Sequence, residues 1–93
     1  MRITYDPKKR AETIANGGLD FDEAPALFAG DTLWIEDDRK DYGELRWQTV
    51  GWLRGSLVMV VWTERGDARH IISMRKCNDR EKTKYEARLD RPG

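Results

Sequence analysis

The side chains best suited to chemistry lie in the second half of the chain, where arginines recur through a run of strand-forming residues. Alternate side chains of a strand share a face, so Arg69, Ser73 and Arg75 would line one face in steps of roughly 7 Å. Phosphates along a nucleic-acid strand are spaced on a similar scale, so this pattern predicts a surface that follows an RNA backbone. A solvated strand face, with arginine stems covering apolar neighbours, is the alternative.

The single histidine, His70, has a side chain whose unperturbed pKa suits proton transfer near neutral pH. Strict alternation would put it on the opposite face from Arg69 and Arg75. Its neighbours on that face would be Ile72 and Met74. A partly buried structural histidine is the alternative to a proton-transfer group.

Composition narrows the classes of function. The lone Cys77 cannot form an internal disulfide, which fits a reducing cytoplasm. One histidine and one cysteine give no metal-binding spacing, so we expect no metal and no cofactor. The formal net charge is zero, which removes a global electrostatic argument for nucleic-acid binding. Residues 20–44 are nevertheless acidic and residues 65–91 basic, which predicts faces of opposite charge. No apolar run is long enough to span a membrane.

A hairpin formed by residues 57–76 is the predicted centre of the fold. Gly66-Asp67 marks a turn between two strand-forming runs. The first run is apolar on both faces and predicts a central strand covered on both sides. The second run, which ends at Lys76, predicts a basic edge strand with one working face.

Capping signals predict three helices. An Asp-Pro pair predicts a helix from residue 7 to about residue 16, before two glycines. Either Asp20, in a capping box with Glu23, or Asp22 would cap a second helix that ends near residue 30. Asn78 with Glu81 forms another capping box and predicts a helix through about residue 89.

These elements predict one α+β domain over residues 1–93, with residues from about 90 to 93 as a frayed tail. Further strand-forming runs occupy residues 32–36 and 45–53. Two N-terminal helices and a C-terminal helix would pack on a four-stranded, mainly antiparallel sheet. Residues 2–5 are a candidate for a short additional N-terminal strand.

Several short motifs occur in the order known for one protein family. They are Tyr5-Asp6-Pro7-x-Lys9, Gly18-Leu19-x-Phe21-x-Glu23-Ala24, Asp41-Tyr42-Gly43-Glu44-x-Arg46, Val60-x-x-Thr63-Glu64-Arg65-Gly66 and Ile71-Ile72-Ser73-x-Arg75-Lys76. Through these motifs the chain resembles the BrnT family of type II toxin–antitoxin toxins over nearly its whole length. Residues 63–76 are the most specific part of the resemblance.

The resemblance implies a RelE-like ribonuclease fold and metal-independent cleavage of RNA that inhibits translation and arrests growth. It also implies a BrnA-like antitoxin that neutralises the toxin in a hetero-oligomer. That antitoxin would carry the DNA-binding function, so this chain would meet DNA only indirectly. The implied substrate is RNA, the implied location is the cytoplasm, and no membrane is involved.

The chain departs from the family pattern at several positions. Gly17 stands where a histidine is common, and His70 stands where an arginine usually precedes Ile-Ile-Ser. Thr13, Met74 and Cys77 replace the usual Asn, Ala and Ala. These departures leave two alternatives to an active toxin: a catalytically weak BrnT-like protein that acts mainly as an antitoxin-binding co-repressor, and a small RNA-binding module.

RNA cleavage without a metal needs a base for the 2′-hydroxyl, positive charge for the phosphorane and a proton for the leaving oxygen. Arg65 and Arg75 suit the phosphorane, because a guanidinium binds two oxygens and stays protonated. Glu64 is a candidate base and Lys9 a candidate phosphate contact, with ordinary surface charges as the alternative for both. We expect Arg65 and Arg75 to line one concave patch beside the basic edge strand.

Further RNA contacts are assigned to the basic strand and the helix that follows it. They are Arg69, His70, Ser73, Lys76 and Arg80. Trp47 or Trp52 would stack on bases if exposed, with core packing as the default. Tyr85 is expected to dock the last helix rather than donate a proton.

Overall fold

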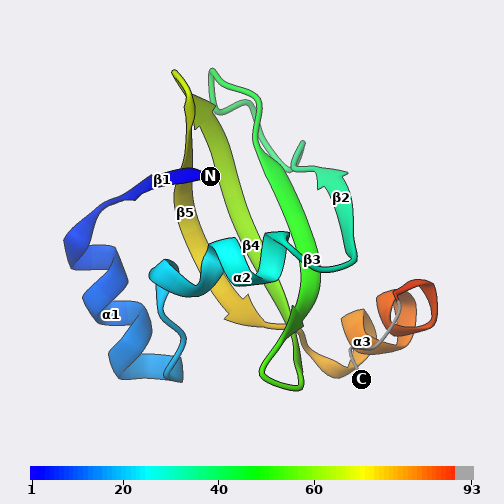
Figure 1. Cartoon of the computed structure of the whole chain (residues 1–93). Coiled ribbons are helices and arrows are strands. Elements are labelled where there is room, and N and C mark those ends of the chain that lie inside the picture. Colours follow the sequence, from blue (N-terminus) through cyan, green and yellow to red (C-terminus); the bar gives the residue numbers. More distant parts are fainter. Residues whose placement is uncertain (90–93) are drawn as a thin grey trace.

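A five-stranded sheet forms the centre of the protein, which a computed structural model describes over residues 1–89 (Figure 1). Its strands are β1 (Arg2–Tyr5), β2 (Thr32–Glu36), β3 (Trp47–Leu53), β4 (Ser56–Arg65) and β5 (Ala68–Lys76). Their order is β1-β5-β4-β3-β2, and β1 and β5 are the parallel pair. The α+β class, the central hairpin and the candidate N-terminal strand, which is β1, are confirmed; with β1 the sheet has five strands instead of the four predicted. The basic strand β5 is not an edge, because β1 pairs with it.

Helix α1 (Pro7–Gly17) begins and ends close to where the sequence predicted. The Asp6 side chain accepts a hydrogen bond from the Lys8 amide, and Pro7 occupies a position where no N–H is needed. Gly18 follows the helix with φ of 71°, a left-handed conformation that glycine adopts without strain.

The second N-terminal helix consists of two short elements, a 3₁₀ turn η1 (Phe21–Glu23) and helix α2 (Ala24–Phe28). Asp20 caps η1 and completes a capping box with Glu23, so the first of the two predicted caps is confirmed. Pro25 has no N–H with which to continue the hydrogen bonds of the preceding turn, which accounts for the division of this segment.

Helix α3 (Asp79–Tyr85) follows the capping box of Asn78 and Glu81, as predicted. Its end tightens into a 3₁₀ turn, η2 (Glu86–Arg88), so the α-helix is shorter than expected. The expected frayed tail, residues 90–93, lies outside the described residues. Within residues 1–89, no helix is both long enough and apolar enough to cross a membrane.

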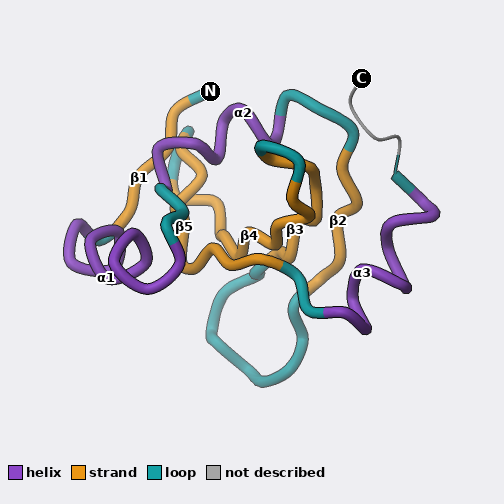
Figure 2. Tube along the Cα trace, turned by 90° about the horizontal axis from the view of Figure 1, so that it is seen from below, coloured by secondary structure: helices purple, strands orange, loops and turns teal. Residues whose placement is uncertain are grey.

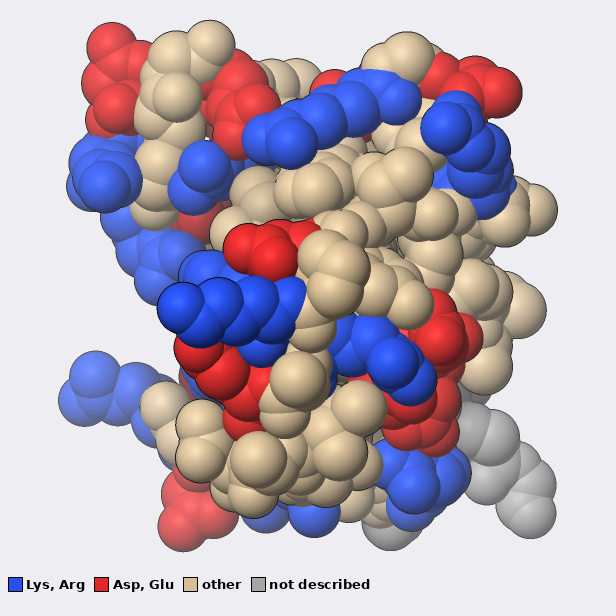
Figure 3. Space-filling view, turned by 90° about the vertical axis from the view of Figure 1, so that its left-hand side faces the viewer, with Lys and Arg blue, Asp and Glu red and all other residues tan. Residues whose placement is uncertain are grey.

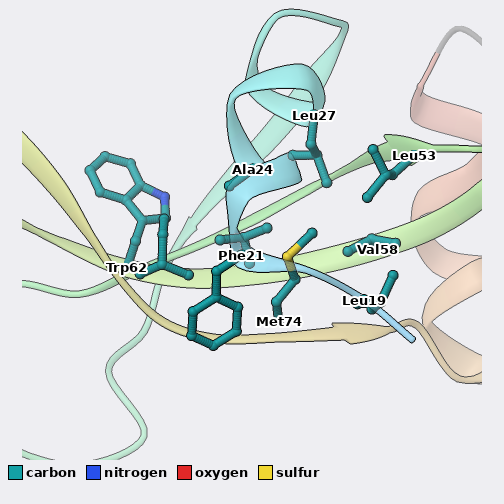
Figure 4. Packing of buried hydrophobic residues seen from close by; sticks show 10 residues of the cluster. Leu19, Phe21, Ala24, Leu27, Leu53, Val58, Trp62 and Met74 are labelled. Carbon is teal, nitrogen blue, oxygen red and sulfur yellow. The ribbon is translucent and has the colours of Figure 1, made fainter. Parts of the chain in front are cut away.

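The two faces of the sheet are covered by different helices. On one face, here called the α2 face, η1 and α2 pack on Val58 and Trp62 of β4 (Figure 4). On the other, the α3 face, Met59 of the same strand packs with Tyr85 and Leu89. Tyr85 therefore docks the last helix, as predicted. This alternation along β4 confirms a central strand that is buried on both sides.

A β-bulge in β5 changes which of its side chains share a face. Val61 of β4 pairs with Ser73, whereas the next residue, Trp62, pairs with Ile71. Ile72 is therefore an extra residue that faces no partner on β4. From Ser73 onward, each side chain of β5 lies on the face opposite to the one that uninterrupted alternation would give it.

The bulge overturns the predicted faces of β5. The side chains on the α2 face are those of Arg69, Ile71 and Met74, and those on the α3 face are His70, Ser73 and Arg75. The prediction that Arg69, Ser73 and Arg75 share a face is wrong, because one unpaired residue resets the strand's period of two. His70 and Arg75, predicted to lie on opposite faces, lie on the same one.

Candidate functional site

Side chains from three parts of the chain meet on the α3 face, at the end nearest the β4–β5 turn; we call them the His70 cluster. They are Thr4, Glu44, Arg46, Arg65 and His70. Strands position His70 from both sides, because Thr4 of β1 and Thr63 of β4 are its register partners. Glu44 and Arg46 come from the loop between β2 and β3.

The loop of residues 37–46 crosses the side of the sheet opposite α2 (Figure 2). Thr63 Oγ1 donates a 2.7 Å hydrogen bond to the carbonyl of Leu45. The Asp37 amide donates one of 2.8 Å to the carbonyl of Arg46. These two bonds fasten the loop to the sheet and bring its polar side chains to β4.

An internal ion pair and an aromatic contact hold the loop's own conformation. The buried Asp37 carboxylate accepts hydrogen bonds of 2.7 and 2.8 Å from the Arg39 guanidinium, which lowers the pKa of Asp37. The guanidinium carbon of Arg46 lies 3.9 Å from the ring centroid of Tyr42. Arg46 is therefore presented in a fixed orientation.

Glu44 joins the two arginines of the cluster. Its Oε2 accepts a 3.0 Å hydrogen bond from Arg46 Nε, and its Oε1 lies 3.7 Å from Arg65 Nη2. The Arg65 side chain is 54% exposed. One carboxylate between two guanidiniums leaves positive charge beside His70 that is open to solvent and to an anionic ligand.

His70 is half-buried, and its Nδ1 lies 2.9 Å from Oγ1 of Thr4. Burial lowers the pKa of His70 below its usual 6.5, and the charge of Arg65 lowers it further. Glu44 and Asp6 act in the opposite direction with smaller effects. The imidazole is therefore mainly neutral near pH 7, the form that accepts a proton.

Ser73 and Arg75 continue the same face away from the His70 cluster. Arg75 stands opposite Met59, six residues before Arg65 on β4, which separates the two arginines by roughly 20 Å. The Arg75 guanidinium donates to both carboxylate oxygens of Glu81, at 2.7 and 2.8 Å. The predicted patch shared by Arg65 and Arg75 is wrong: they lie at opposite ends of one face.

Glu64 and Arg69 are register partners on the α2 face, so neither belongs to the His70 cluster. The guanidinium carbon of Arg69 lies 4.5, 4.7 and 5.0 Å from the ring centroids of Phe28, Trp62 and Trp34. Arg69 thus packs on aromatic rings rather than following the line of His70 and Ser73. Glu64 is exposed and makes no hydrogen bond or ion pair within residues 1–89.

The other candidate residues lie apart from the cluster. Lys9 and Arg80 are exposed on α1 and α3. Lys76 ends β5 and lines a cavity of about 310 Å³ together with Asn16 and Gly17. The two tryptophans considered for base stacking, Trp47 and Trp52, pack against the two cores and are half-buried.

Charge on the side of the molecule that carries α1 is mixed. Lysine and arginine side chains there alternate with aspartate and glutamate (Figure 3). Arg10, for example, donates two 2.8 Å hydrogen bonds to Asp20. The view shows small positive patches instead of one continuous basic face. Among the described residues, no three His, Cys, Asp or Glu side chains are grouped so as to hold a metal ion.

Sequence reasoning missed three members of the cluster: Thr4, Glu44 and Arg46. The signal for the last two was present, because residues 41–46 form one of the motifs on which the family resemblance depends. Their place beside His70 depends on how an irregular loop folds back over the sheet. Thr4 reaches His70 only through the parallel pairing of β1 with β5.

Comparison with known protein families shows which family the chain belongs to. A family model described as the ribonuclease toxin BrnT of type II toxin–antitoxin systems matches residues 5–81. That range includes every member of the His70 cluster except Thr4. A search of curated proteins gave no match. Because the family match extends from the end of β1 into α3, the chain belongs to the BrnT family of ribonuclease toxins of type II toxin–antitoxin systems.

Proposed function

We propose that this toxin is a metal-independent endoribonuclease whose reaction takes place at the His70 cluster. The observation that carries the proposal is a half-buried histidine of lowered pKa with Arg65 beside it. A proton acceptor and a phosphate-binding cation in one site meet two of the three requirements for cleavage by a ribose 2′-hydroxyl, and water can supply the third, a proton for the leaving oxygen. The family's description as ribonuclease toxins supports RNA as the substrate.

The proposed reaction begins at the imidazole. If Nδ1–H of His70 donates to Thr4 Oγ1, Nε2 is free to accept the proton of the 2′-hydroxyl. The 2′-oxygen attacks the neighbouring phosphorus, and the bond from phosphorus to the 5′-oxygen breaks as that oxygen takes a proton from water. The hydroxide that remains removes the proton from the imidazolium and restores neutral His70. The products are a 2′,3′-cyclic phosphate and a 5′-hydroxyl. We assign the base to His70 instead of Glu64, because Glu64 lies on the other face of the sheet.

Two guanidiniums would stabilise the phosphorane. Arg65 is half-exposed at the cluster, and Arg46 lies behind Glu44. Each offers paired N–H donors to the developing negative charge. Ser73 and Arg75 would hold phosphates further along the same strand of RNA, since they extend the α3 face away from the cluster. Outer phosphate contacts by Lys9, Lys76 and Arg80 stay predictions.

The test is cleavage of RNA by purified, antitoxin-free protein in the presence of EDTA, with the cut ends mapped. We expect cyclic phosphate ends and full activity with the chelator. His70→Ala and Arg65→Ala should each lower the cleavage rate by about 100-fold or more. Arg88→Ala, an exposed arginine on η2, is the matched control and should cleave like wild type. Cleavage that EDTA abolishes, or full activity in His70→Ala, would refute the proposal.

We further propose that a BrnA-like antitoxin neutralises the toxin in the cytoplasm and that contact with DNA is made through this antitoxin alone. Membership of a type II toxin–antitoxin family supports a protein partner. Titrating the antitoxin into the cleavage reaction should stop it at a fixed molar ratio. The isolated toxin should not shift operator DNA in a mobility assay, whereas the complex should.

A catalytically weak protein that acts mainly by binding the antitoxin is the second candidate function. The observation that favours it is Gly17, which offers no side chain to the 310 Å³ cavity at a position where the family commonly has histidine. Induction without the antitoxin separates the two functions. Growth arrest that His70→Ala relieves supports the ribonuclease, and growth like the uninduced culture supports the binding protein.

A further inference from the structure

A cavity lies at the same end of the sheet as the His70 cluster, between side chains of the α2 face and the loop that covers the α3 face. Its volume is about 270 Å³, and it is lined by Trp34, Glu44, Leu45, Trp47, Thr63 and Glu64. Two of these are exposed large apolar side chains, with 46% of Trp34 and 54% of Leu45 accessible. Exposed apolar side chains around a hollow are a common feature of binding sites.

The indole of Trp34 is held in a fixed orientation. Its Nε1 donates a 3.1 Å hydrogen bond to Oγ1 of Thr32. Its ring meets that of Trp62 edge-to-face at 5.2 Å and that of Trp47 at 5.9 Å. The Arg69 guanidinium lies 5.0 Å from its centroid. A rigid, half-exposed indole is a stacking platform for a flat ring, because little side-chain entropy is lost on binding.

The cavity also carries a carboxylate that is free to accept hydrogen bonds. Glu64 is exposed and has no hydrogen-bond or ion-pair partner among residues 1–89. Its two oxygens suit a ligand that presents two N–H donors side by side. Among the four RNA bases only guanine does so, through N1 and N2. Adenine, cytosine and uracil each place an acceptor next to the donor on the same edge.

The cavity and the His70 cluster share a wall. Glu44 lines the cavity and also contacts Arg46 and Arg65. Thr63 lines the cavity and is the register partner of His70. A base seated in the cavity would therefore belong to a nucleotide close to the phosphate held at the cluster.

We propose that this cavity binds an unpaired guanine of the RNA, stacked on Trp34 and hydrogen-bonded through N1–H and N2–H to the Glu64 carboxylate. The inference rests on the proposed function, because it names the base recognised beside the same cleavage site. It assigns Glu64 to recognition of the substrate and leaves proton transfer to His70.

The experiment measures binding of four oligouridine strands that differ in one central base, which is G, A, C or U. All carry 2′-O-methyl groups, so that the toxin cannot cleave them. We expect the guanine strand to bind about tenfold more tightly than the others, because each alternative base leaves a polar group facing the carboxylate. Glu64→Gln should abolish this preference. Glu12→Gln, an exposed glutamate on α1, is the matched control and should keep it.

Stacking is tested separately at Trp34. Trp34→Ala should weaken binding of the guanine strand about tenfold or more, and Trp34→Phe should restore most of the loss. Equal binding of the four strands by wild type would overturn the proposal, as would an unchanged guanine preference in Glu64→Gln. Loss of antitoxin binding in Trp34→Ala with unchanged RNA affinity would assign the cavity to the protein partner, and would also overturn it.

Failure of the proposed function is distinguishable from failure of this inference. His70→Ala should retain the guanine preference in binding and lose cleavage of an unmodified strand. If His70→Ala cleaves like wild type, the assignment of the base is refuted, while the binding series still decides the role of the cavity. If the binding series shows no guanine preference, cleavage at the His70 cluster still stands.

Discussion

At the scale of single residues, the pKa of His70 reports the charges that surround its imidazole in the cluster. Arg65 lowers this pKa and Glu44 raises it, so removing either charge should move it in a known direction. We expect Arg65→Ala to raise the pKa and Glu44→Gln to lower it further. Because the chain has one histidine, the imidazole C2 proton can be followed by NMR without assignment work. An unchanged pKa in Arg65→Ala would contradict the proposed contact.

The same pKa predicts the pH dependence of cleavage. A base must be unprotonated, so the cleavage rate should rise with pH through the pKa of His70 and level off above it. Since burial and Arg65 hold that pKa below 6.5, the rate should already be near its plateau at pH 7. In Arg65→Ala the acid limb should move to higher pH, in step with the NMR titration. If the acid limb of the rate profile and the pKa measured by NMR shift by different amounts in Arg65→Ala, His70 is not the base.

At the scale of elements, local signals in the sequence were sufficient for the caps and turns. Asp20 and Asn78 were identified as caps because a side chain that accepts from nearby amides leaves a short-range pattern. The bulge at Ile72 leaves no such pattern, since it depends on how β5 pairs with β4 over its whole length. The faces of Ser73 and Arg75 were therefore mispredicted, although their strand was correctly placed.

Close packing of α2 on the sheet depends on Gly51 of β3. A Cβ at this position would lie 3.1 Å from Leu27 Cγ and Cδ2 and from Thr32 Cγ2. We expect Gly51→Ala to lower the free energy of unfolding by about 1–3 kcal/mol in urea denaturation, because the core must shift to admit the methyl group. Gly17→Ala is the matched control, since nothing lies within 4 Å of its Cβ. An equal loss in both variants would contradict this account.

The ion pair of Arg75 and Glu81 fastens α3 to β5 and predicts a pH dependence of stability. The pKa of Glu81 is about 2 in the folded protein, below its usual 4.5, mainly because Arg75 binds the carboxylate. The unfolded chain therefore takes up this proton first as pH falls. The contribution is complete above about pH 4.5 and is lost as pH falls towards 2.

Glu81→Gln tests this contribution, because glutamine can keep the capping box while removing the charge. In urea denaturation near neutral pH, we expect the variant to be less stable by about 1–2 kcal/mol, a figure reduced for the half-exposed Arg75. The difference should vanish near pH 2. Buried Cys77, whose pKa burial raises to about 11, offers a second measurement. Its labelling by a thiol reagent should be faster in the variant, because α3 opens more often.

At the scale of the whole molecule, zero net charge means that RNA is not attracted from a distance. Affinity must then come from the few guanidiniums that touch phosphate, so its salt dependence should be shallow. For a single strand, each phosphate contact contributes about 0.7 to the slope of log K against log salt. Arg65→Ala should reduce the slope by about this amount and Arg88→Ala should not. A steep slope that both variants share would indicate diffuse attraction.

The unpaired Ile72 is a position at which β5 can lose a residue and keep its pairing. Ile71 already pairs with Trp62 and Ser73 with Val61, so removal of Ile72 would give an uninterrupted ladder in which every other residue keeps its face. An extra residue inserted after Ser73 would instead turn Met74 out of the apolar layer beneath α2 and Arg75 into it. Within this nine-residue strand, the insertion should therefore lower the free energy of unfolding much more than the deletion does.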